Sequence, residues 1–327
     1  MNPRSDLTMK TRRLFSLLLS VLLILSAWSA GAEGLQPLDM DSTAIAPAPK
    51  DECYLSDNEY QDESIHVTIE EGDFEEVHYF TARIKISHPS QLRTTPGYQT
   101  FNPAGDFTSG YANEPFGRDM ASVANAVVAI NGDYFTKQAT CHICLRQGAQ
   151  IRNIAHGRDA LAVNREGDMI LLPQFTKEDY KAYYTEHGKE LYQVFCFGPA
   201  LVTDGKSVIP EGYQDPNAEI ISMRKTQRVA ICQIGPLEYA IVVCDGDALF
   251  YTYGLTLDAF ARLCEKVGNE MSPEGFKIAY NLDGGNSATL VFKRKNEEGQ
   301  LVYQKLNMPE RERGLADMIC FVSLVQE

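Results

Sequence analysis

Positive charge is scarce in this sequence. The 327 residues include 30 lysines and arginines against 44 aspartates and glutamates, so the formal net charge is −14. A chain this acidic repels nucleic acid and anionic lipid surfaces over a Debye length of about 8 Å. No block of lysine and arginine with interleaved aromatic residues is present. Nucleic acid is therefore excluded as a partner, and any anionic ligand has to meet a local cluster of hydrogen-bond donors.

Several catalytic signatures are also missing. The sequence contains no Gly-x-Ser-x-Gly elbow, no His-Glu-x-x-His zinc signature and no Walker A loop. Ser287 has no obvious histidine partner, since the chain holds only six histidines. These absences argue against a serine hydrolase, a zinc protease of this type and a P-loop nucleotidase.

Long apolar runs are confined to the beginning of the chain. Residues 14–28 are almost wholly apolar, follow four basic residues and precede the small residues Ala30-Gly31-Ala32. This pattern predicts a secretory signal peptide over residues 1–32. A span needs roughly 20 residues, so an uncleaved anchor is the weaker alternative. We expect a secreted protein, extracellular or in the cell envelope, without stable membrane insertion unless this segment is retained.

Eight cysteines in an exported chain raise the question of disulfides. Four lie in apolar contexts that are typical of buried thiols, namely Cys232, Cys244, Cys264 and Cys320. Cys141 and Cys144 form a CxxC pair without a second CxxC, which favours a local disulfide or two loop thiols over a metal or redox site. Cys53 has no predicted partner.

The chain reads as one large α+β domain with mixed β-sheets flanked by a few helices. Residues 33–60 are rich in proline and small residues and are predicted to be a linker, which leaves residues 61–327 for the domain. Strand-like alternation begins at Ser64, and Asp204-Gly205 predicts a tight hairpin. The clearest amphipathic helix begins at Leu257 and is expected to end just before Gly268.

Four polar tips interrupt apolar sequence. They are Asn131 with Asp133, Arg228, Asp245 with Asp247, and Asp283 to Ser287. Each one alone has an ordinary interpretation as a turn, a solvated strand end or a helix cap. Together they supply donors for a phosphate and carboxylates for acid and base chemistry at a sugar carbon. We therefore treat the four tips as one candidate site.

Five segments of the chain occur in a recognisable order. They are AINGDYF (129–135), FGPALVTDGK (197–206), RVAICQ (228–233), VVCDGD with GLTLDAFARL (242–263), and NLDGGNSATLV (281–291). In this order they resemble the phosphodiester glycosidase domain over about residues 121–322, with the Asn-Leu-Asp-Gly-Gly element the most specific part. That family includes the uncovering enzyme, an N-acetylglucosamine-1-phosphodiester α-N-acetylglucosaminidase, and exported bacterial relatives associated with exopolysaccharide.

The resemblance implies catalytic roles for three aspartates. Asp133 matches the family's first polar tip, Asp245 the aspartate after its central strand, and Asp283 its glycine-rich signature. Asp283 or Asp133 would activate water or attack the anomeric carbon. The separation between them, which decides between retention and inversion, is not encoded in the spacing.

The resemblance also implies substrate-binding and phosphate-binding residues. They are Arg228, the N–H groups of Gly284 and Gly285, Ser287, and Asn131. Three positions depart from the family pattern: Val229 replaces a threonine, Cys232 replaces a glycine, and Asn286 replaces a glycine or serine. The first two departures favour an alternative in which the protein only binds its glycan.

The implied reaction is cleavage of the C1–O bond in a sugar-1-phosphodiester, with N-acetylglucosamine as a candidate sugar. The expected partner is a glycan or sugar-phosphodiester substrate, and no cofactor or metal is required. Clustered aspartates would also suit Ca²⁺ or Mg²⁺. A metal-dependent phosphodiesterase on the same scaffold is accordingly a second alternative.

Overall fold

A computed structural model describes residues 35–97, 115–133, 143–153, 156–215 and 221–326. Residue contacts divide the chain into two compact units, residues 1–36 and residues 37–327, and the account below concerns the second. The predicted signal peptide lies outside the described residues. Among the described helices, none is long and apolar enough to cross a membrane.

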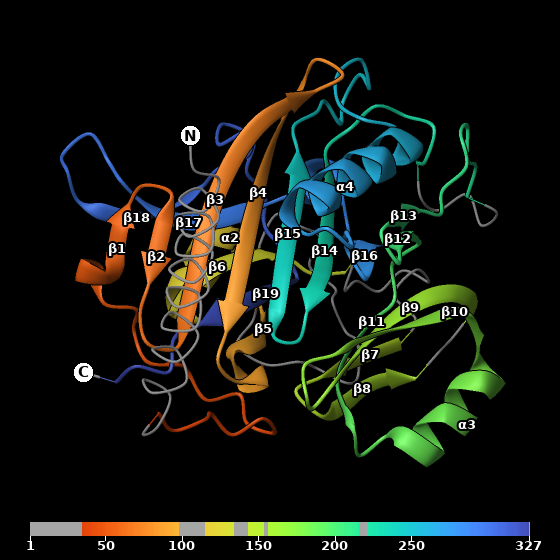
Figure 1. The fold of residues 1–327 in the computed structure, drawn as a ribbon, viewed down its shortest axis with the longest axis horizontal. Helices are drawn as coiled ribbons and strands as arrows, with labels where there is room; N and C mark the ends of the chain where they lie inside the picture. Colours follow the sequence, from red (N-terminus) through yellow and green to blue (C-terminus); the bar gives the residue numbers. More distant parts are fainter. Residues whose placement is uncertain (1–34, 98–114, 134–142, 154–155, 216–220, 327) are drawn as a thin grey trace, which may run out of the picture. The chain divides into compact units, whose positions relative to one another are not determined.

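The largest sheet has nine strands and carries the centre of the fold (Figure 1). In spatial order the strands are β1 (Tyr54–Ser56), β2 (Glu59–Gln61), β3 (Ile65–Phe74), β4 (Val77–Ile86), β15 (Glu238–Cys244), β14 (Arg228–Gly235), β16 (Ile278–Asn281), β12 (Ala200–Thr203) and β13 (Lys206–Ser207). Asp204 and Gly205 have φ of +48° and +74° in the β12–β13 hairpin, which confirms the predicted turn.

A five-stranded sheet packs against one face of the nine-stranded sheet. Its strands in order are β18 (Leu301–Lys305), β17 (Leu290–Lys295), β6 (Ala126–Asn131), β19 (Asp317–Val322) and β5 (Leu92–Pro96). The main apolar core joins the two sheets, with Ile231 and Val243 on one side and Ile130 and Phe321 on the other. The short helix α2 (Gly117–Val123) covers the outer face of the smaller sheet.

The opposite face of the nine-stranded sheet is covered by helix α4 (Leu257–Met271) (Figure 1). The Thr256 side chain caps the beginning of α4 by accepting a hydrogen bond from the Ala259 N–H at 3.4 Å. The helix continues past Gly268, where the sequence predicted its end. A β-carbon on Gly268 would lie 2.8 Å from the Phe276 nitrogen, so this glycine serves close packing.

A third sheet of five strands lies beside helix α3 (Lys177–His187). Its strands in order are β10 (Met169–Thr176), β9 (His156–Asn164), β11 (Leu191–Phe195), β7 (Ile143–Arg146) and β8 (Ala149–Asn153). Three short 3-10 turns complete the described elements: η1 (Asp51–Cys53), η2 (Pro89–Gln91) and η4 (Gly285–Ser287).

The α+β class with a few helices is confirmed, but two details differ from expectation. Every pairing made by the described strands is antiparallel, whereas mixed sheets were expected. The predicted linker at residues 33–60 contains β1 and β2, because Tyr60 is completely buried in the core. Further upstream, Arg93 holds the chain by donating to the backbone carbonyl of Asp39 at 2.9 Å.

Candidate functional site

Three of the four polar tips meet at one edge of the nine-stranded sheet. β14 lies between β15 and β16 and is antiparallel to both, with Arg228 paired to Cys244 and Ala230 paired to Asn281. Two strands that flank an antiparallel neighbour both end where that neighbour begins. Asp245 and Asp283 therefore lie on either side of the start of β14, two strand spacings or about 10 Å apart.

The fourth tip reaches the same place through Asn131. At the end of β6, the Asn131 Nδ2 donates to the Asp283 carbonyl oxygen at 2.7 Å, and its Oδ1 accepts from the Thr289 N–H at 3.0 Å. Nδ2 also donates to the Gly132 carbonyl at 3.1 Å. The Asn131 amide thus holds the 283–289 turn, and its substrate-binding role stays a prediction.

The Asp283 carboxylate is partly accessible to solvent. Its side chain is 18% exposed, and its Oδ2 lies 3.5 Å from Nη2 of Arg313. The same Arg313 nitrogen donates to the Ser287 hydroxyl oxygen. Burial raises the pKa of Asp283 to about 6, although Arg313 and a hydrogen bond from Ser287 act in the opposite direction. Asp283 is therefore suited to exchange protons close to neutral pH.

Asp245 has a similar pKa for the same reason. Burial raises the pKa of Asp245 to about 6, against the favourable charges of His78 and Lys305. Its Oδ1 is buried and has no hydrogen-bond partner among the residues that the structure describes. The same holds for Oγ1 of Thr226 and Nε2 of Gln227, which stand directly before β14. Buried polar groups are normally paired, so this concentration of unpaired ones indicates a place for a polar ligand or water.

The glycines of the site pack two turns against the chain that enters β14. A β-carbon on Gly284 would lie 2.7 Å from the Gln227 carbonyl oxygen, and one on Gly246 would lie 2.3 Å from the Gln227 nitrogen. Gly285 has φ of +56°, and its N–H donates to the Gln227 carbonyl at 2.9 Å. The Gly284 N–H donates to the Asp283 carboxylate. The phosphate-binding role of the two N–H groups stays a prediction.

Arg228 is also engaged elsewhere. Its side chain is buried, with Nε donating to the Leu255 carbonyl at 3.2 Å and Nη2 to the Ile221 carbonyl at 2.6 Å and the Arg224 carbonyl at 3.0 Å. Burial lowers the pKa of Arg228 to about 10. These contacts hold two loops at this end of the sheet, and the phosphate-binding role of Arg228 stays a prediction. The cation beside Asp283 is Arg313.

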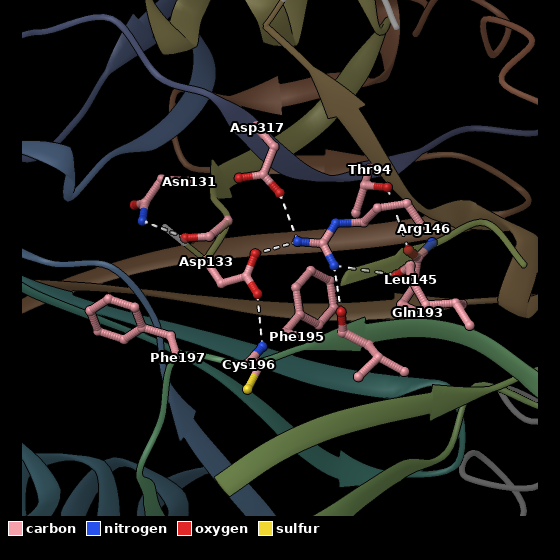
Figure 2. Close-up of polar contacts among 12 residues, drawn as sticks. Thr94, Asn131, Asp133, Leu145, Arg146, Gln193, Phe195, Cys196, Phe197 and Asp317 are labelled. Carbon is pink, nitrogen blue, oxygen red and sulfur yellow. Dashed lines mark hydrogen bonds and ion pairs between the residues drawn. The ribbon is translucent and has the colours of Figure 1, made fainter. Parts of the chain in front are cut away.

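Asp133 forms part of a buried ionic cluster (Figure 2). Its Oδ1 accepts from Nη2 of Arg146, and its Oδ2 accepts from the Cys196 N–H at 2.7 Å. Arg146 Nη2 also donates to Oδ2 of Asp317 at 3.0 Å, and the guanidinium lies 4.3 Å from the centre of the Phe195 ring. Burial raises the pKa of Asp317. Both oxygens of Asp133 therefore accept hydrogen bonds within this cluster, and its catalytic role stays a prediction.

Sequence reasoning missed the cations of the site. Arg313 belongs to the charged run 310–313, which directly precedes the last core strand and could have been recognised as a fifth polar tip. Lys305 is buried at the end of β18, and its Nζ donates to the carbonyls of Met308 at 3.1 Å and Arg311 at 2.6 Å. Burial lowers the pKa of Lys305 to about 8. Lys305 thereby fixes the segment that carries Arg313.

The three departures from the family pattern fall into two groups. Val229 is buried in the core between the two sheets, and Cys232 is buried on the opposite face beneath α4. The two positions that favoured a binding-only protein therefore both lie in the apolar interior. Asn286 belongs to the exposed part of η4.

Seven of the eight cysteines lie among the described residues. The four cysteines predicted to be buried are buried, and no disulfide joins the seven that the structure describes. Cys144 is a buried free thiol, while its predicted partner Cys141 lies outside the described residues. Within the same residues, no group of three or more His, Cys, Asp or Glu side chains is arranged to hold a metal.

Comparisons with known proteins identify the family and the fold. A family model for phosphodiester glycosidases matches residues 124–322, which is more than half of the chain. The fold is similar to the catalytic domain of zebrafish N-acetylglucosamine-1-phosphodiester α-N-acetylglucosaminidase, auto-inhibited by its pro-peptide, with a TM-score of 0.56, 16% identity, and coverage of 85% of this chain and 87% of that one. A hypothetical protein from Synechocystis gives a TM-score of 0.52 and 15% identity over 79% of this chain and 62% of that one. A search of curated protein sequences finds no match.

Proposed function

This chain belongs to the phosphodiester glycosidase family, and we propose from that premise that it hydrolyses a sugar-1-phosphodiester at the C1–O bond. The products are a free sugar and a phosphomonoester. The observation that carries the proposal is Asp283, a partly exposed carboxylate with a pKa of about 6 beside the Arg313 guanidinium. The carboxylate can act as a base toward the water that attacks C1, and the guanidinium can stabilise the phosphate that leaves.

The proposed role of each group in the reaction follows from its environment. A phosphate ester is already a good leaving group, so the site has to stabilise its negative charge more than protonate it. Arg313 is placed for that task, since its Nη2 lies beside both Asp283 and Ser287. Asp283, mostly ionised at pH 7 yet more basic than an ordinary aspartate, removes the proton from the attacking water.

Asp245 acts on the sugar side in this proposal. Its Oδ1 has no partner among the described residues, and the same is true of Thr226 Oγ1 and Gln227 Nε2. A sugar presents hydroxyl and amide groups that can satisfy all three atoms. N-acetylglucosamine is the sugar we propose, because it is the one in the name of the zebrafish relative.

The substrate is expected outside the cell. The signal peptide predicted at residues 1–32 would export the chain, and the acidic composition requires a local site for an anionic substrate. An envelope or extracellular glycan that contains sugar-1-phosphate diesters fits both conditions.

The test is hydrolysis of UDP-N-acetylglucosamine and a panel of sugar-1-phosphodiesters by the chain from Glu33. Asp283→Asn and Asp245→Asn are compared with Asp204→Asn, which keeps the Asp-Gly hairpin turn as Asn-Gly. Reactions are run in ¹⁸O-labelled water with and without EDTA. We expect the ¹⁸O label in the free sugar. We expect Asp283→Asn to lower kcat/KM by about 10²- to 10⁴-fold, because the substitution removes a proton transfer.

Three results would overturn the proposal. Label in the phosphate would indicate a phosphodiesterase that cleaves the P–O bond. Loss of activity with EDTA would assign the reaction to a metal. Equal rates for the wild type and folded Asp283→Asn would leave a protein that holds its glycan without cleaving it.

A further inference from the structure

An apolar surface with two basic residues lies next to the Asp283 turn. Its most exposed members are Leu249 and Phe250, whose side chains are 71% and 72% exposed. The adjoining loop adds two exposed apolar side chains and two exposed cations. We call this surface the apolar rim, and it consists of Ile221, Met223, Arg224, Lys225, Leu249 and Phe250.

The two loops of the apolar rim are joined to each other and to the site. The Arg224 guanidinium lies 4.6 Å from the centre of the Tyr251 ring, and the Leu257 N–H donates to the Ser222 carbonyl at 2.8 Å. A β-carbon on Gly285 would lie 3.5 Å from the Ala248 β-carbon. Because Ala248 directly precedes Leu249, the apolar rim adjoins the glycine-rich turn of the site in space.

The exposure of these side chains is imposed by the backbone. Oδ1 of Asp247 accepts from the N–H groups of Leu249 at 2.8 Å and Phe250 at 3.2 Å. Arg228, buried beneath the other loop, donates to the carbonyls of Ile221 and Arg224. Loops held in this way present apolar groups without an ordering cost when a partner binds.

Charge identifies the kind of partner. The whole chain carries a net charge of −14, so an anionic surface is repelled everywhere except where cations are concentrated. Large apolar side chains next to arginine and lysine are the composition of segments that lie in the lipid headgroup region. A soluble protein rarely exposes such a patch without a function.

We propose that the apolar rim seats the site on a phospholipid bilayer, with Leu249 and Phe250 among the acyl chains and Arg224 and Lys225 at the headgroup phosphates. This deepens the proposed function, on which it rests for the identity of the substrate, a sugar-1-phosphodiester carried by a lipid. The acidic β3–β4 turn, with Asp73, Glu75 and Glu76, is linked to the same loop, because the Tyr253 hydroxyl accepts from the His78 N–H at 3.2 Å. Anionic headgroups are therefore attracted only at Arg224 and Lys225.

The test uses the tryptophan content of the chain. The one tryptophan is Trp28, in the predicted signal peptide, so the chain from Glu33, which retains the whole compact unit 37–327, has none. Phe250→Trp places a reporter in the rim. Leu55→Trp places one on β1, at the far edge of the nine-stranded sheet, where the leucine is 57% exposed. Each variant is mixed with vesicles of phosphatidylcholine alone or with phosphatidylglycerol.

We expect vesicles to shift the Phe250→Trp emission to the blue and to leave Leu55→Trp unchanged. In the Phe250→Trp protein, Leu249→Ser should lower the vesicle partition coefficient by about fivefold or more, because one large apolar side chain is withdrawn from lipid. Adding Arg224→Glu and Lys225→Glu should lower it further. All of these side chains are exposed, so an unchanged melting temperature controls for folding.

The inference is overturned if neither reporter shifts, or if both shift equally. A shift of Phe250→Trp that depends on protein concentration without vesicles would instead assign the rim to a second copy of the chain. The readout needs no turnover. Vesicle binding without hydrolysis of a soluble phosphodiester would therefore remove the proposed activity alone, while hydrolysis without vesicle binding would remove the lipid surface alone.

Discussion

Two clusters in this molecule combine aspartates with an arginine, and they differ in how far the charges are withdrawn from water. In the cluster of Asp133, Arg146 and Asp317, the side chains are 0–2% exposed and are joined by direct ion pairs (Figure 2). In the pair of Asp283 and Arg313, the side chains are 18% and 29% exposed, and the nitrogen and oxygen are 3.5 Å apart. The residue types are the same in both places.

The difference separates positioning from chemistry. A buried carboxylate whose oxygens both accept hydrogen bonds has nothing left to offer a substrate, and its neighbours depend on it for shape. A partly exposed carboxylate with a raised pKa can reach a substrate and exchange a proton with it. We therefore propose the first role for Asp133 and the second for Asp283, although the family resemblance implied the same catalytic role for both.

The strongest way to break this comparison is to remove the buried cation. Arg146→Met leaves Asp133 and Asp317 facing each other in the interior without a counter-charge. We expect the free energy of unfolding to fall by about 3–5 kcal/mol, as for other buried pairs that lose one member. Urea denaturation measures the loss, and Arg313→Met is the matched control. Similar losses for the two arginines would contradict the distinction.

The second prediction concerns the stability of Asp283→Asn and its dependence on pH. A carboxyl group with a pKa of about 6 in the folded protein and an ordinary value when unfolded destabilises the fold above pH 6. The native state binds the proton more tightly between pH 4 and 6, so this penalty disappears as the pH falls toward 4. Asp283→Asn should therefore be more stable than the wild type by about 1–3 kcal/mol at pH 8, and equal to it near pH 4.

Denaturation of both proteins across this pH range measures the effect. Asp204→Asn, at an exposed hairpin turn, should follow the wild type at every pH. If Asp283→Asn is instead less stable at pH 8, the carboxylate is part of the scaffold, as Asp133 is.

The convergence of the tips shows how much of this site the sequence contains. The apolar runs ending at Asn131, Asp245 and Asp283 were recognisable as buried strands with polar ends, because a short continuous apolar run bounded by turn residues is a local property. Their meeting at one edge depends on strand order, since β14 lies between β15 and β16. Strand order is set by packing between segments distant in sequence, and no local pattern reports it.

The roles within the site were less predictable than its location. Whether Arg228 contacts a phosphate or a backbone carbonyl depends on which loop folds over it, and here the 221–224 and 255 carbonyls occupy its nitrogens. The glycines of the Asp283 turn were recognised, but their use in close packing against Gln227 required the neighbouring chain. Arg313 was missed because its partner Asp283 lies 30 residues earlier in the chain, and no local sequence pattern links the two.

The third prediction concerns the influence of Arg313 on Asp283. The guanidinium lowers the pKa of Asp283, so Arg313→Gln should raise it by about one unit. The acidic limb of the pH profile of kcat/KM should move upward by the same amount. Arg313→Lys, which keeps the charge, should restore the limb toward its original position. If the acidic limb does not move when the charge at residue 313 is removed, the titration belongs to another group.

The smallest expected effect comes from an ion pair that is short but open to solvent. Arg83 Nη2 lies 2.5 Å from Oε1 of Glu238 across β4 and β15, closer than Arg313 lies to Asp283, yet Arg83 is 44% exposed. Water solvates both partners whether or not they meet, and salt screens what attraction remains. Arg83→Met should therefore change the free energy of unfolding by less than about 1 kcal/mol, and by less still in high salt. Urea denaturation at low and high salt measures both changes. A loss near that of Arg146→Met would mean that contact distance, and not burial, decides what an ion pair contributes in this fold.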